Sequence, residues 1–104
     1  MSNDLEQINK ISELAISKGL NPGMLQDCAE KFGPGSPPVL GCLLALVREA
    51  WADPGVSCGP YYAHDGQVAG WSVAQYLNRS GGFDEIGCGA TEAEALADTL
   101  EAAP

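Results

Sequence analysis

The segment of residues 87–101 constrains the fold more than any other part of this sequence. It opens with Gly87-Cys88-Gly89-Ala90, which suits a tight junction between the end of a strand and the start of a helix. Thr91 can cap the first helical turn, and Glu94 three residues later completes a Thr-x-x-Glu capping box. The apolar residues that follow recur at helical spacing: Ala93, Leu96, Ala97 and Leu100. This narrow stripe predicts a helix that lies flat on a sheet formed by the residues just upstream.

Three further helices are predicted in the N-terminal half of the chain. The first spans residues 4–18 and is capped at Asn3, with apolar residues recurring at helical spacing. The second spans residues 21–33 and carries proline in its first helical position. The third spans residues 37–52, with Ser36 as its cap followed again by proline.

The apolar residues of the second and third helices predict what each one buries. The second helix should point four side chains inward: Leu25, Cys28, Ala29 and Phe32. The third helix has the widest apolar surface in the chain, which indicates a central place in the core. We therefore expect Leu43 and Val47 to be buried.

Beyond residue 53 the composition changes, and glycine and aromatic residues dominate as far as Gly89. Strands are predicted at residues 61–64, 67–77 and 83–88. The first two should be joined by a tight turn at Asp65-Gly66, and a second turn is expected at residues 78–82.

With a last helix at residues 92–102, the predicted order is α-α-α-β-β-β-α. We expect one α+β domain over residues 1–104, with a helical half at 1–53 and a βββα half at 54–104. In this fold the three strands form an antiparallel meander, and the C-terminal helix packs on the sheet.

Acidic residues outnumber basic ones: 14 Asp and Glu face 5 Lys and Arg, a formal net charge of −9. A surface of this kind repels nucleic acid, whose binding requires lysine and arginine to displace counterions. Two interpretations of the acidity stay open. It can serve solubility, or it can form an acidic face that docks on a basic protein surface.

No run of apolar residues is long enough to span a membrane, and the N-terminus lacks the pattern of a secretory signal, so we expect a cytoplasmic protein. The four cysteines form no Cys-x-x-Cys pair, and His64 is not at ligand spacing from any of them. We therefore expect reduced, structural thiols, with neither a metal site nor a cofactor.

Two short stretches contain residue types that occur in catalytic or ligand-binding sites. His64 and Asp65 are adjacent at a turn between strands, where neighbouring side chains point to opposite faces, so they are poorly placed as a catalytic dyad. Residues 33–36 precede a helix but contain no Lys or Arg to bind phosphate. No constellation of catalytic residues is found, and we do not expect an enzyme.

From residue 51 onward the chain resembles the phage ABA sandwich domain family. The resemblance covers about half of the chain and is carried by the following residues: Trp51, Tyr62, Trp71, Gly87, Gly89, Ala90, Thr91, Ala95, Leu96 and Leu100. These residues determine turns and packing, and none of them is a catalytic or ligand-binding residue. The resemblance implies a phage or prophage accessory protein and transfers no catalytic residue.

Aromatic and acidic residues supply the candidate partner-binding positions. Alternation along the second strand sends Trp71 and Val73 to one face and Tyr76 to the other, so some rings are core and some can contact a partner. The candidate positions are Tyr61, Tyr76, Asp84, Glu85, Glu92, Glu94, Asp98 and Glu101.

The function expected from these features is binding and stoichiometric inhibition of a host protein, in its most specific form an inhibitor of a bacterial defence system in the manner of an anti-CRISPR. The alternatives are a small-ligand binding protein, for instance for nucleotide signals, and a homo-oligomeric virion or assembly component. A homodimer is compatible with either a binding or an assembly role.

Overall fold

The computed structural model describes residues 4–77 and 82–104. The elements are α1 (Asp4–Ser17), α2 (Leu25–Phe32), α3 (Pro37–Ala50), β1 (Ser57–Tyr62), β2 (Val68–Leu77), β3 (Gly82–Gly89) and α4 (Glu92–Ala102). The predicted order α-α-α-β-β-β-α is confirmed. The predicted cap at Asn3 and most of the turn at residues 78–82 lie outside the described residues.

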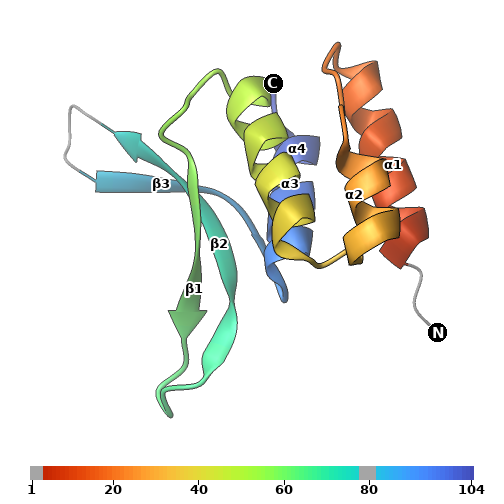
Figure 1. Cartoon of the computed structure of the whole chain (residues 1–104). Coiled ribbons are helices and arrows are strands. Elements are labelled where there is room, and N and C mark those ends of the chain that lie inside the picture. Colours follow the sequence, from red (N-terminus) through yellow and green to blue (C-terminus); the bar gives the residue numbers. More distant parts are fainter. Residues whose placement is uncertain (1–3, 78–81) are drawn as a thin grey trace.

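The elements stack in three layers (Figure 1). The strands form an antiparallel sheet in the order β1-β2-β3, and α4 packs on one face of it, mainly against β3 and β2. Helix α3 lies beside α4 in the same layer, and α1 and α2 form the outer layer on the far side of these two helices. The fold is therefore α+β with its C-terminal helix on the sheet, and no described helix covers the opposite sheet face.

The core lies between the sheet and the helices. Leu43 and Val47 of α3 are fully buried, as predicted, and they join an apolar cluster with Leu25, Val73, Leu96 and Leu100. The indole Nε1 of Trp51 donates a 2.9 Å hydrogen bond to the backbone oxygen of Thr99 and so ties the end of α3 to α4.

Two glycines allow β3 to approach α4 closely. A Cβ atom built at Gly87 would overlap the Thr99 hydroxyl and lie 2.9 Å from the Thr99 Cβ, and one at Gly89 would lie 2.6 Å from the backbone nitrogen of Ala95. The Thr99 hydroxyl in turn donates a 2.7 Å hydrogen bond to the oxygen of Ala95. Any side chain at either glycine would push the helix off the sheet.

A β-bulge at Ile86 changes which side chains of β3 share a face. Val73 pairs with Gly87, but Ala74 pairs with Glu85, so Ile86 is an extra residue on β3. Simple alternation from Gly87 would place Glu85 on the helix-covered face. The bulge instead places it opposite Ala74, on the face that the described helices leave uncovered.

The predicted start of the second helix is wrong. The helix begins at Leu25 because the Asn21 side chain accepts a hydrogen bond from the nitrogen of Gly23, which has a positive φ of 59°. This turn uses the residues that were expected to start the helix. Ser36 precedes α3 as predicted, but its hydroxyl donates to the oxygen of Gly33 and caps no helical amide.

The prediction that Phe32 points inward is also wrong, since its side chain is 56% exposed. Phe32 is the last residue of α2, and the chain turns away at Gly33, whose φ is 98°. The ring consequently lies past the edge of the core, where the Lys31 ammonium sits 5.6 Å from its centroid.

The first strand begins four residues earlier and ends two residues earlier than predicted. It spans Ser57–Tyr62, whereas residues 63–66 form the hairpin turn, with the nitrogen of Gly66 donating to the oxygen of Ala63. The start of the strand was not predicted because Gly59 and Pro60 are residue types that are rare in central strands. Pro60 is tolerated because β1 is an edge strand.

Leu43→Ala should lower the free energy of unfolding by about 2–5 kcal/mol, because it removes a fully buried side chain from the core. Urea denaturation measures the loss. Leu44→Ala, at a half-buried neighbouring position, is the control and should cost less. Equal stabilities of the two variants would contradict the central place of α3.

Gly87→Ala should destabilise the fold by about 1–3 kcal/mol, since the new methyl group overlaps Thr99. The cost should be smaller in a Thr99→Ala background, because most of the overlap is with the Thr99 side chain. Gly59→Ala is the matched control, as a Cβ there meets no atom within 4 Å. Thermal melts that rank Gly59→Ala with Gly87→Ala would refute the close approach.

Candidate functional site

The side of the sheet that the described helices leave uncovered is a candidate binding surface, and it is called the open sheet face below. Val73 is buried beneath the helices, so the alternate residues of β2 point the other way: Gly70, Ser72, Ala74 and Tyr76. Their paired neighbours complete this face: Ser57, Gly59 and Tyr61 on β1, and Phe83, Glu85 and Cys88 on β3.

Aromatic rings stand at the two ends of the open sheet face. Tyr61 lies across Gly70, where a Cβ atom would come 2.6 Å from the Tyr61 Cζ. At the other end Tyr76 and Phe83 form an edge-to-face pair with centroids 5.3 Å apart. The exposed fractions are 45% for Tyr61, 46% for Tyr76 and 69% for Phe83. Small side chains occupy the strip between the rings.

The structure brings some of the predicted partner-binding residues together. Tyr61, Tyr76 and Glu85 share the open sheet face. Asp84 is also exposed but pairs with Gln75, so it projects from the opposite side of the same strands. Phe83 had not been selected as a binding residue. Only the bulge at Ile86 brings it onto this face, and the sequence carries no clear signal for that bulge.

Two predicted binding residues of α4 make structural hydrogen bonds. Thr91 accepts from the nitrogen of Glu94 at 3.1 Å, which confirms the predicted cap. The Glu94 carboxylate reaches back as expected, but it accepts from the nitrogen of Ala90 at 3.2 Å, one residue before the cap. The Asp98 carboxylate accepts from the nitrogen of Cys88 at 3.1 Å and so satisfies an amide of β3. These carboxylates hold the strand–helix junction.

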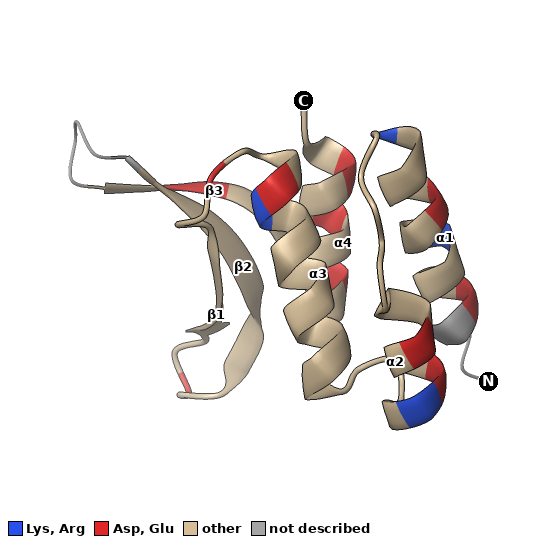
Figure 2. Ribbon diagram, turned by 45° about the horizontal axis from the view of Figure 1, so that its top comes forward, with Lys and Arg blue, Asp and Glu red and all other residues tan. Residues whose placement is uncertain are grey.

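The remaining carboxylates are spread widely. Figure 2 shows Asp and Glu on α1, α2 and α4 as well as on β3. Glu101 is exposed on the last turn of α4, whereas Glu92 is half-buried at its first turn. The acidity therefore forms no single patch over the described residues.

The described cysteines are free thiols, and two of them have raised pKa values. Burial, and then the charge of the Glu92 carboxylate, raise the pKa of Cys58 to about 11. Burial raises the pKa of Cys42, and the neighbouring Cys28 thiol adds to this effect. Both groups are therefore protonated at neutral pH and are weak nucleophiles.

The two stretches considered for catalysis or ligand binding form turns. His64 is exposed in the β1–β2 turn, and the Asp65 carboxylate accepts from the nitrogen of Gln67 at 3.0 Å. Among the described residues, no three His, Cys, Asp or Glu side chains come together to hold a metal ion. Within the same ranges, no helix combines the length and the apolar character that crossing a membrane requires.

None of the family models, curated proteins and solved structures compared with this chain matches it. The structure defines an α+β protein with a three-stranded antiparallel sheet, covered on one face by described helices.

Cys58 should react slowly with iodoacetamide at about pH 8.5, the ordinary thiol pKa, because its raised pKa keeps it protonated. In Glu92→Gln the loss of the carboxylate charge lowers that pKa, so alkylation of Cys58 should begin at lower pH, although burial still delays it. Peptide mass spectrometry against pH gives both profiles, with exposed Cys88 as the internal reference. Identical profiles for Cys58 in the two proteins would contradict the contact with Glu92.

Proposed function

We propose that this chain is a small acidic binding protein that docks on a basic surface of a host protein and inhibits it stoichiometrically. The observation that supports the proposal is the open sheet face. It presents exposed rings at both ends, a carboxylate at Glu85 and a strip of small side chains between them.

The rings suit a protein interface because tyrosine and phenylalanine bury a large area and lose little conformational entropy on binding. The small residues between them, Ser72 and Ala74, let a partner approach the sheet closely. Tyr76 and Phe83 already hold each other in place, so little ordering is needed when they are covered.

The edges of the sheet are less suited to binding than its face. Pro60 removes an amide donor from β1, and Asp98 occupies the amide of Cys88 on β3. Addition of a partner strand would have to displace or avoid both features. Binding through side chains on the face meets neither obstacle.

The net charge favours a basic partner over a second copy of this chain. Each copy carries a formal net charge of −9, so two copies repel each other. A basic surface, such as a channel that normally holds nucleic acid, would instead be attracted.

The resemblance of the C-terminal half to the phage ABA sandwich domain supports a phage accessory protein, and inhibition of a defence system is the most specific form of this proposal.

The test is to capture partners from a bacterial lysate with the tagged chain and to measure the affinity of a purified partner against salt. Tyr76→Ser with Phe83→Ser should weaken binding by about 2 kcal/mol or more, roughly 30-fold, and Glu85→Lys should weaken it most at low salt. Met24→Ser with Phe32→Ser, which removes equally exposed apolar side chains from the α2 region, is the matched control.

Binding that is indifferent to the ring and charge changes, or that weakens equally in the control, would overturn the role of the open sheet face. A captured protein that is chemically altered by this chain would overturn stoichiometric inhibition.

A further inference from the structure

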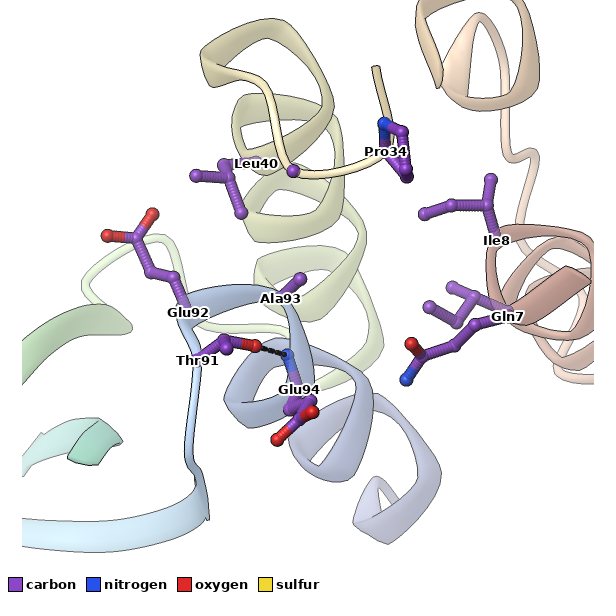
Figure 3. A pocket seen from close by; sticks show the side chains of 10 residues that line it. Gln7, Ile8, Pro34, Leu40, Thr91, Glu92, Ala93 and Glu94 are labelled. Carbon is purple, nitrogen blue, oxygen red and sulfur yellow. Dashed lines mark hydrogen bonds between the residues drawn. The ribbon is translucent and has the colours of Figure 1, made fainter. Parts of the chain in front are cut away.

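A hollow of about 320 Å³ lies on the helical side of the molecule, between α1, α3 and the first turn of α4. Figure 3 shows Leu40 and Ala93 on one side of it and Pro34 and Ile8 on the other. Gln7 reaches from α1 towards Glu94, and Glu92 extends alongside Leu40. The hollow thus has apolar walls and polar groups at its rim.

The rim disfavours an anion although a helix begins there. Thr91 already accepts from the nitrogen of Glu94, and Glu94 accepts from the nitrogen of Ala90, so these two amides are not free to bind an anion. The two carboxylates of Glu92 and Glu94 would repel a phosphate, and no lysine or arginine lines the hollow. A nucleotide is therefore a poor occupant.

A second hollow of about 440 Å³ adjoins the first and shares Leu40 and Glu92 with it. Its walls are also apolar, with Leu44, Leu96 and Cys58 among them. Glu92 therefore projects a carboxylate between two apolar hollows. The Glu92 charge also raises the pKa of the Cys58 thiol, which lines the second hollow.

We propose that the first hollow receives a lysine side chain of a partner protein, with the aliphatic stem against Ile8, Leu40 and Ala93 and the ammonium group at Glu92. The size of the hollow is at the lower limit of ligand pockets, which suits one side chain better than a larger organic ligand. A lysine combines the apolar stem and the positive end that these walls and this rim complement.

The hollow and the open sheet face are separate contact sites. The hollow opens among the helices, whereas the open sheet face is the side of the sheet turned away from α4. The inference goes beyond the proposed function, because a lysine can bind here whether or not the sheet face contacts a partner.

The probe is the peptide acetyl-Leu-Lys-Leu-amide, titrated into the ¹⁵N-labelled chain and followed by amide chemical shifts. We expect saturable shifts at Gly35, Thr91 and Ala93 with millimolar or tighter affinity. The same peptide with an acetylated lysine has lost the charge and should bind much more weakly. Shifts that gather on β2 and β3, or no saturable shift at the hollow, would overturn the proposal.

Glu92→Gln should weaken binding of the peptide about fivefold to tenfold, because a charge-assisted hydrogen bond becomes a neutral one. Ala93→Leu should abolish binding by filling the hollow, and the amide spectrum reports whether each variant is folded. Glu30→Gln and Ala102→Leu make the same changes at exposed sites away from the hollow and should bind like the wild type.

Equal affinities of Glu92→Gln and Glu30→Gln would show general attraction to an acidic protein and would refute a specific site. Phe83→Ser tests whether the peptide binds at the hollow or at the open sheet face. It should leave the titration unchanged, and a loss of peptide binding in this variant would contradict the position of the site.

Discussion

The close contact between β3 and α4 is the constraint on which the rest of this structure depends. Gly87 and Gly89 present bare backbone to Thr99 and Ala95, so the helix can lie directly on the strand. The capping box at Thr91 and Glu94 fixes where the helix starts, and the Asp98 carboxylate returns to the amide of Cys88. Strand and helix are thereby held in one register, and the remaining elements pack around this pair.

The position of α1 and α2 explains why one face of the sheet is left uncovered by the described helices. These two helices pack on α3 and α4, so the middle layer is covered on both sides and must be apolar on both. This accounts for the wide apolar surface of α3. The open sheet face carries Gly70, Ser72 and Ala74 at its centre, which expose little apolar area to water between the rings.

The features predicted correctly from the sequence were those with local chemistry. The Thr91 cap, the β1–β2 turn and the apolar stripe of α3 depend on residues close together in the chain. The stripe expected on α4 was right at Leu96 and Leu100 but missed Ala95 and Thr99, which are fully buried. The predictions were wrong where contacts between residues distant in the sequence determine the structure. Phe32 has the helical spacing of a buried residue, but it lies beyond the edge of the core. Pro60 is unfavourable in a central strand, but it is tolerated in β1 because β1 is an edge strand. The bulge at Ile86 depends on how β3 meets α4, so Phe83 was not selected as a binding residue.

The acidic residues of α4 show why net charge is a poor guide to a binding site. Glu94 and Asp98 were predicted to face a partner, yet each accepts a backbone hydrogen bond that maintains the junction with β3. Replacing either one would remove a hydrogen bond of this junction, so a loss of binding in such a variant could not be separated from a change in the fold. Glu85 and Glu92 differ, since the first stands on the open sheet face and the second between two apolar hollows. The carboxylates best placed to select a partner are thus those beside exposed apolar surface, where the charge decides which cation is accepted and the apolar contact supplies affinity.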